Sequence, residues 1–215
     1  MYINESSISW NSDIFNFINH NLQNPILDQS MPIITNFGTE EWLMIIVFIL
    51  LITSLIAKKD KLKKIIIIFL ISIIVSIFIT ELLKGIFSES RPFIAFSNVH
   101  LLADGSPFRS FPSGHSSNIF TLITVFGLNY SLKIRGKSFK LLWVLLPLGI
   151  LVALSRVYVG VHFPLDLIAG TMIGIVSGGI VSILINKYIK LNKYLSIITF
   201  ILFVLVSVYI KYCVI

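Results

Sequence analysis

Residues 65–83 read IIIIFLISIIVSIFITELL, nineteen consecutive positions with a single charged side chain, Glu81. An apolar run of this length is typical of a helix that crosses a lipid bilayer. Five further apolar runs occupy residues 42–57, 114–132, 139–155, 164–185 and 194–212. Some are near the short limit, so flanking aromatic residues or local thinning of the bilayer must make up the length. The pattern predicts an all-α integral membrane protein with about six transmembrane helices.

The composition of the whole chain favours the same class. Of the 215 residues, 56% are hydrophobic and 13% are charged, which is more apolar surface than a soluble domain of this size can hide. We expect one membrane domain over residues 1–215, with the transmembrane bundle at 42–212. The single cysteine, Cys213, excludes an internal disulfide framework.

Residues 1–40 are mixed in character, and no run within them is long enough to cross a bilayer. Apolar side chains recur at roughly helical spacing at Ile14, Phe15, Phe17, Ile18 and Leu22. The spacing predicts a short amphipathic helix that lies in the membrane interface and breaks at Pro25. We expect His20 and the Asn residues to form its polar face.

The basic residues flank apolar runs in short clusters, which argues against a nucleic-acid partner despite the net charge of +7. Three loops, at 58–64, 133–140 and 187–193, hold 12 of the 17 Lys and Arg residues. The positive-inside rule then places these loops in the cytoplasm. Both termini and the connections at 85–113 and 156–163 are predicted to lie outside.

The first polar cluster on the predicted outer side is KGIFSESRP, residues 84–92. Lys84 and Arg91 are seven residues apart, so both face the same way if the helix continues that far. Pro92 is then expected to end the helix. The alternative is that both cations are interfacial side chains that reach toward water.

The second cluster is FPSGHSS, residues 111–117. Pro112 suits a helix start, and the early backbone N–H groups at Ser113 and Gly114 would attract an oxyanion. Gly114 lets a ligand approach the main chain closely, and His115 would sit beside that anion as a proton donor or acceptor. A simple helix cap followed by an interfacial histidine is the alternative.

The third cluster is SRVYVGVHFPLD, residues 155–166, which contains the fixed cation Arg156. Pro164 suits a helix start, and Asp166 lies four residues after His162, within reach of its ring. A carboxylate that bonds one imidazole nitrogen leaves the other nitrogen free for attack. The alternative is a purely structural His–Asp pair.

Together the clusters place three cations, a helix N-terminus, two histidines and one carboxylate on the same predicted membrane face. Such a set suits a phosphate dianion, which Arg binds in a bidentate manner. No metal-ligand spacing accompanies it, so we expect phosphate chemistry without a metal or cofactor, with the cations stabilising the transition state.

The three clusters resemble the three-part signature of the type 2 phosphatidic acid phosphatase superfamily, which includes acid phosphatases and vanadium haloperoxidases. The matching positions are Lys84, Arg91-Pro92, Pro112-Ser113-Gly114-His115, Ser155-Arg156, His162 and Asp166. The resemblance implies that His162 attacks phosphorus and forms a phosphohistidine, oriented by Asp166. It implies that His115 protonates the leaving oxygen and then activates water. The remaining residues, Lys84, Arg91, Ser113, Gly114 and Arg156, would hold the phosphoryl oxygens.

Within that superfamily a membrane lipid phosphatase fits best, because the site would open at the membrane face. Polyprenyl diphosphate phosphatases of the carrier-lipid cycle are the preferred resemblance, and phosphatidylglycerol-phosphate or phosphatidate phosphatases are the alternative. A non-catalytic membrane scaffold or transporter is the alternative from another class. Five polar residues near the motifs have no role in the signature and are expected to be solvated, with headgroup contact as the alternative: Glu81, Glu89, His100, Asp104 and Arg109.

Overall fold

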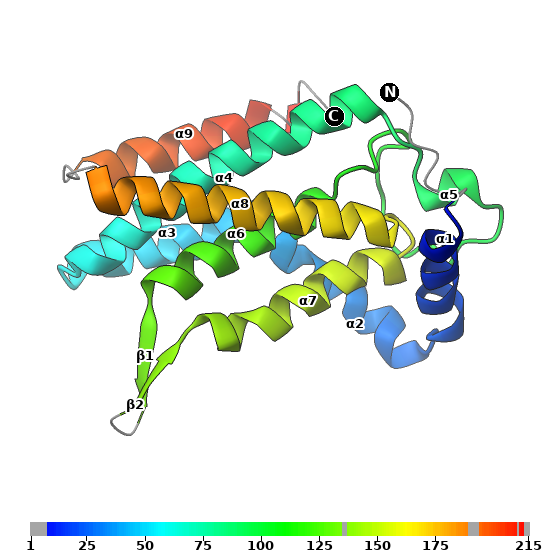
Figure 1. Ribbon diagram of the computed structural model, residues 1–215, viewed down its shortest axis with the longest axis horizontal. Helices are drawn as coiled ribbons and strands as arrows, with labels where there is room; N and C mark the ends of the chain where they lie inside the picture. The colour runs from blue at the N-terminus through cyan, green and yellow to red at the C-terminus, as the bar shows by residue number, and fades with distance from the viewer. Residues whose placement is uncertain (1–7, 135–136, 189–193, 210, 213–215) are drawn as a thin grey trace.

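A computed structural model describes residues 8–134, 137–188, 194–209 and 211–212. Long helices lie side by side in a bundle, and shorter helices gather at one end of it (Figure 1). The elements in chain order are α1 (Ser9–Asn16), the π-helix η2 (Phe17–Asn21), α2 (Pro25–Thr35), the 3-10 helix η3 (Asn36–Gly38), α3 (Glu40–Ile56), α4 (Asp60–Phe87), α5 (Pro92–Ala95), α6 (Gly114–Asn129), β1 (Ser131–Ile134), β2 (Lys137–Lys140), α7 (Leu142–Tyr158), α8 (Pro164–Tyr188) and α9 (Leu195–Tyr209).

Helices α4, α6 and α8 form the centre of the bundle (Figure 1). The faces of α6 and α8 meet closely because small residues lie between them. A Cβ atom at Gly170 or Gly174 would lie 2.3 or 2.5 Å from a backbone oxygen of α6. Small residues allow this close approach of helices in membrane proteins. The contact fixes the start of α6 against the start of α8, where the second and third polar clusters lie.

All six predicted apolar runs are helical, as α3, α4, α6, α7, α8 and α9. By length and composition, two segments in the described part of the chain can each cross a membrane: α8, and the stretch Asp60–Ala95 that contains α4 and α5. A third span exists if residues 25–38 and α3, which meet at a bend of 60°, count as one. Helices α7 and α9 are apolar but shorter. The mainly helical membrane class is therefore confirmed, whereas six crossings remain a prediction.

A two-stranded hairpin, β1–β2, departs from the all-α prediction. Ser131 pairs with Lys140 and Ile134 with Lys137 in antiparallel register. The runs predicted at 114–132 and 139–155 are correspondingly shorter, since α6 ends at Asn129 and α7 begins at Leu142. Polar and apolar residues alternate in this loop, as is typical of strands. The backbone N–H and C=O groups pair across the hairpin instead of continuing the hydrogen bonds of a helix.

The N-terminal segment differs from the predicted single interfacial helix. Residues 9–38 form four short helices that pack against α6, α7 and the start of α8. The prediction that the Asn residues form the polar face of this helix is wrong for Asn19, which is fully buried, and Asn11 before it is also buried. Asn19 bonds the backbone at the end of α7 and Asn11 bonds the backbone at the start of α8, which compensates for their burial.

The predicted basic loops gather at one end of the bundle. The turn between α3 and α4, the hairpin, and the facing ends of α8 and α9 lie at this end, whereas α1, α5 and the start of α8 lie at the other (Figure 1). Residues 135–136 and 189–193 of these loops lie outside the described residues. The chain segments that carry or flank the clustered basic residues thus lie at one end of the bundle, and the three polar clusters lie at the other.

Candidate active site

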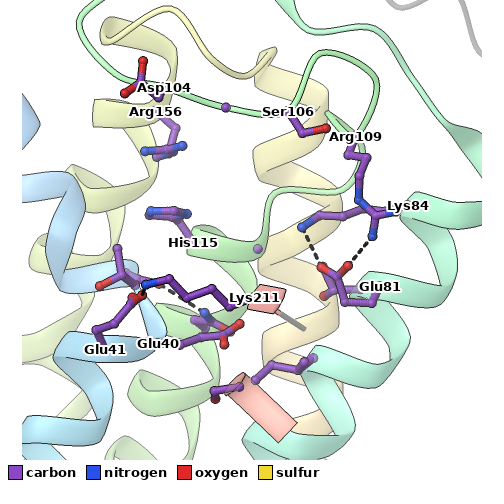
Figure 2. Close-up of a pocket in the computed structure, with 18 of the residues that line it drawn as sticks. Glu40, Glu41, Glu81, Lys84, Asp104, Ser106, Arg109, His115, Arg156 and Lys211 are labelled. Atoms are coloured by element: carbon purple, nitrogen blue, oxygen red, sulfur yellow. Dashed lines mark hydrogen bonds and ion pairs between the residues drawn. The ribbon is translucent and has the colours of Figure 1, made fainter. Parts of the chain in front are cut away.

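A pocket of about 510 Å³ lies where the three polar clusters meet. Six of the eight predicted site residues line it: Lys84, Arg91, Gly114, His115, Arg156 and His162. Ser113 and Asp166 lie behind this wall and are fully buried. In Figure 2, Arg156 and His115 lie close to each other on one side of the pocket and Lys84 lies across from them. The structure therefore brings together residues from all three motifs, which span 83 positions of the chain from Lys84 to Asp166.

The His162–Asp166 pair has the predicted contact. Helix α8 begins at Pro164, so Asp166 lies in its first turn and reaches back to His162. The carboxylate oxygen Oδ2 lies 2.9 Å from Nδ1 of His162. The same oxygen accepts from the Ser110 hydroxyl at 2.6 Å and from the Phe163 backbone N–H at 2.9 Å. Three donors on one oxygen fix the carboxylate, and the carboxylate fixes the ring.

The other ring nitrogen of His162 faces the pocket. Nε2 lies 3.3 Å from Nη1 of Arg91. A guanidinium only donates, so this contact requires a lone pair on Nε2 and places the ring proton on Nδ1, toward Asp166. Burial, with Arg91 and Arg156 nearby, holds the pKa of His162 well below its ordinary value. The imidazole is therefore expected to be neutral at neutral pH, with Nε2 facing the pocket beside the Arg91 guanidinium.

Arg91 is held by the loop that follows it rather than by a helix. Helix α4 ends at Phe87, with Ser88 in the left-handed conformation, and Pro92 begins α5 instead of ending a helix as predicted. The Arg91 side chain donates to the carbonyls of Ser106 at 2.7 Å and Val161 at 2.9 Å. Lys84 and Arg91 thus share the pocket although they do not share a helix.

Arg156 approaches the pocket from the end of α7 and is 5% exposed. Its Nη1 donates to the hydroxyl of Thr35 at 2.9 Å. Its Nε is buried and makes no hydrogen bond within the described part of the chain. A buried guanidinium with spare donors is suited to an anionic ligand.

The second cluster contributes the start of α6. Ser113 is the N-cap, and its hydroxyl accepts from the Ser116 N–H at 3.4 Å, so Pro112 precedes the helix rather than starting it. A Cβ at Gly114 would lie 3.5 Å from Nζ of Lys84. The start of α6 and the Lys84 amine therefore lie next to each other at the pocket, and an oxyanion bound there would be close to both. The Ser113 side chain itself is occupied by capping and does not line the pocket.

Two of the five residues without a role in the signature form an ion-pair group with Lys84. Glu81 accepts from Lys84 at 2.7 Å and pairs through its other oxygen with Arg109 (Figure 2). Glu89 is 2% exposed. The expectation of solvated side chains is therefore wrong for Glu81 and Glu89, because neighbouring cations or burial remove them from water. Asp104 is exposed at the pocket wall, as expected.

Several residues at the site carry no sequence signal of their own. Ser110 bonds the carboxylate of Asp166, and Thr35 bonds Arg156. Gly105 packs so closely that a Cβ there would lie 2.8 Å from the Arg91 guanidinium carbon. Isolated Ser, Thr and Gly residues are common in loops, and only the assembled fold shows that these three touch the site. Among the described residues, no group of three or more His, Cys, Asp or Glu side chains gathers as a metal site.

Comparison with known proteins agrees with this geometry. Residues 65–190, which include all three motifs, match the model of the PAP2 superfamily, and the chain belongs to that family. An undecaprenyl-diphosphatase from Sulfolobus acidocaldarius is 33% identical over 79% of this chain and 76% of its own length. The bacitracin transport permease protein BcrC of Bacillus licheniformis is 26% identical over 78% of this chain and 76% of its own length.

Two solved structures have a similar fold. LpxE from Aquifex aeolicus superimposes with a TM-score of 0.67 at 32% identity, covering 83% of this chain and 98% of that chain. A transmembrane PAP2-type phosphatidylglycerolphosphate phosphatase from Bacillus subtilis gives a TM-score of 0.66 at 22% identity, covering 86% and 88%. The family and the enzyme class predicted from the motifs, a hydrolase of lipid phosphates, are confirmed.

Proposed function

We propose that this protein is an integral membrane phosphatase that converts a polyprenyl diphosphate, of the undecaprenyl type, to the monophosphate through a phosphohistidine. The observation that carries the proposal is the His162 ring, which bonds Asp166 on one side and faces a pocket with Arg91 and Arg156 on the other. An undecaprenyl-diphosphatase at 33% identity supports the choice of substrate.

In the proposed reaction, Nε2 of His162 attacks the terminal phosphorus, and the bond to the leaving phosphate oxygen breaks. Arg91, Arg156, Lys84 and the first N–H groups of α6 stabilise the negative charge on the phosphoryl oxygens. Asp166 stabilises the positive charge that develops on the imidazole as the nitrogen–phosphorus bond forms. His115 protonates the leaving oxygen and then takes a proton from water, which hydrolyses the phosphohistidine.

Two features of a diphosphate substrate, its leaving group and its second phosphate, agree with the residues that line this pocket. A phosphate leaving group needs less protonation by His115 than an alkoxide does. Arg109 supplies a cation beyond the three of the signature and lines the same pocket as Lys84. We infer that it meets the second phosphate of the substrate.

The alternative substrate is phosphatidylglycerol phosphate or phosphatidate. A phosphatidylglycerophosphatase B from Bacillus subtilis, 37% identical over 70 residues, favours it. Competition between polyprenyl diphosphate and each of these lipids in the same mixed micelles tests the choice. We expect the diphosphate to have the higher specificity constant, and Arg109→Gln to lower that constant more for the diphosphate than for phosphatidate. A higher constant for either monoester in the unmodified protein would overturn the proposed substrate.

The alternative from another class is a transporter or scaffold, and one relative carries the name transport permease. Phosphate release by the purified protein decides between them. We expect release from at least one lipid phosphate, and loss of release in His162→Gln. No release from any lipid phosphate or diphosphate would favour the non-catalytic class.

We also propose that six helices cross the membrane and that the site faces the extracytoplasmic side, because the basic loops lie at the opposite end of the bundle (Figure 1). Cysteines introduced as Asp104→Cys and Lys61→Cys, each with Cys213→Ser, report the orientation. An impermeant thiol reagent is expected to label intact cells at position 104 and not at position 61. The reverse labelling would place the active site in the cytoplasm.

A further inference from the structure

The N-terminal segment, residues 9–38, lies outside the residues 65–190 that match the family model. We propose that this segment positions the active site, and that Thr35 is a positioning residue for Arg156. The inference rests on the proposed function, since it assumes that Arg156 binds the phosphoryl group. Four polar residues or groups carry it: together they contact the 88–113 loop, α6, the end of α7 and the start of α8.

The most direct contact is made by Thr35, the last residue of α2. Its hydroxyl accepts from Nη1 of Arg156 at 2.9 Å, and its side chain is 4% exposed. Helix α2 packs along α7, which carries Arg156. A long guanidinium side chain has many rotamers, and a buried acceptor selects one of them. With Nη1 held by Thr35, the guanidinium lines the pocket in one fixed orientation.

Asn19 bonds two segments next to the active site, the 88–113 loop and the end of α7. Its amide nitrogen donates to the carbonyls of His100 at 2.9 Å and Tyr158 at 2.8 Å, and its oxygen accepts from the His100 N–H at 2.9 Å. His100 lies in the loop between Arg91 and Ser113, and Tyr158 lies between Arg156 and His162. One fully buried side-chain amide thus fixes the distance between the 88–113 loop and the end of α7.

Two further contacts are made with the helices α8 and α6 near His162 and His115. The oxygen of Asn11 accepts from the Leu165 N–H at 2.9 Å, next to Asp166. The carbonyl of Gly38 accepts from Asn118 on α6 at 3.2 Å. A Cβ at Gly38 would lie 3.0 Å from the Cβ of His115, so the backbone of η3 is in close contact with the proposed acid. These contacts restrain the starts of α8 and α6, which position His162 and His115.

These contacts are hydrogen bonds, whose strength depends on the angle and the distance between donor and acceptor. Buried polar groups are costly unless paired, so each contact favours one relative placement of two chain segments. Catalytic groups must be held within a fraction of an ångström of their productive positions. The segment therefore acts on catalysis through Arg156, His115 and the His162–Asp166 pair without itself touching the substrate.

The test uses three variants of the full chain in detergent. Thr35→Val keeps the side-chain shape and removes the acceptor for Arg156, Thr35→Ser keeps the hydroxyl, and Ser30→Ala removes a hydroxyl from the same helix away from the site. We measure kcat and KM for lipid phosphate hydrolysis and the inhibition constant of vanadate, which mimics the five-coordinate phosphoryl group. Wild-type protein that hydrolyses no lipid phosphate would refute the proposed function, and not this inference alone.

We expect Thr35→Val to lower kcat/KM and to weaken vanadate in parallel, by about tenfold to a hundredfold, which is the range for a hydrogen bond to a charged group. Thr35→Ser and Ser30→Ala are expected to stay within about twofold of wild type, since neither removes a hydrogen bond to a charged group. In an Arg156→Ala background, Thr35→Val should cause no further loss if it acts through Arg156.

Three results would overturn the inference. One is a Thr35→Val protein with wild-type kcat/KM in an assay where the wild type is active. The second is a fall in kcat with unchanged KM and vanadate inhibition, which indicates a smaller folded fraction. The third is an equal loss from Thr35→Val with and without Arg156, which indicates an effect that does not pass through the guanidinium.

Discussion

The substitution Asp166→Asn removes a charge from the active site while changing its shape little. The amide oxygen of Asn is able to take the place of Oδ2 and accept from His162, Ser110 and Phe163, as the carboxylate does. What is lost is the negative charge beside a ring that becomes positive as Nε2 bonds phosphorus. The experiment therefore separates the electrostatic role of Asp166 from its role in holding the ring.

The size of the loss follows from the geometry. The Nδ1–Oδ2 distance of 2.9 Å puts the two charge centres roughly 4 Å apart. At an effective dielectric constant of about 20, such charges interact by about 4 kcal/mol. Since each 1.36 kcal/mol corresponds to about tenfold in rate, kcat should fall about a thousandfold. Ser110→Ala is the matched variant, because it removes one of three donors to the same oxygen and should cost about tenfold.

The assay is single-turnover release of labelled phosphate from a lipid diphosphate in detergent micelles, with thermal unfolding measured in parallel. We expect both variants to remain folded, because the buried oxygen keeps at least two donors in each. An Asp166→Asn protein within tenfold of wild type would refute the electrostatic role. A Ser110→Ala protein as slow as Asp166→Asn would show that ring placement, and not charge, limits the rate.

Three further predictions follow from the same site. His115→Ala should slow turnover strongly for alkyl phosphates and less for substrates with good leaving groups, and an equal loss across a leaving-group series would argue against a general acid. Vanadate should inhibit and EDTA should not, so activity lost in EDTA and restored by Mg²⁺ would refute a reaction supported by side-chain cations alone. Because burial and nearby Arg91 and Arg156 hold the pKa of His162 well below its ordinary value, the ring should stay neutral as the pH falls through 6.5. Histidine NMR of the labelled protein, assigned with His162→Gln, measures this, and a midpoint at or above 6.5 would contradict it.

The sequence predicts those parts of the molecule that depend on local chain geometry. Apolar length places α8 within three residues of its observed end, at 185 against Tyr188. The four-residue spacing of His162 and Asp166 predicts their contact, because Pro164 starts the helix and Asp166 in its first turn reaches back to His162. Charge clustering groups the basic loops, which lie at one end of the bundle (Figure 1).

Contacts between distant segments were not predictable in the same way. Asn11 and Asn19 look like surface residues until the loops that they bond are in place. Thr35 meets Arg156 across 121 positions of the chain, and no local pattern marks that pairing. Glu81 lies within an apolar run three residues before Lys84, but its second partner, Arg109, becomes evident only after the loop at 88–113 folds back on α4.

The central claim is that His162 becomes phosphorylated, and trapping the intermediate tests it most directly. Protein is mixed with lipid diphosphate labelled with ³²P in its terminal phosphate, quenched in alkali within one turnover, and digested. We predict an alkali-stable, acid-labile label on the peptide that contains His162, more label in His115→Ala because hydrolysis of the intermediate slows, and none in His162→Gln. Turnover without any label on His162 in wild type and in His115→Ala, or equal label in His162→Gln, would contradict the account.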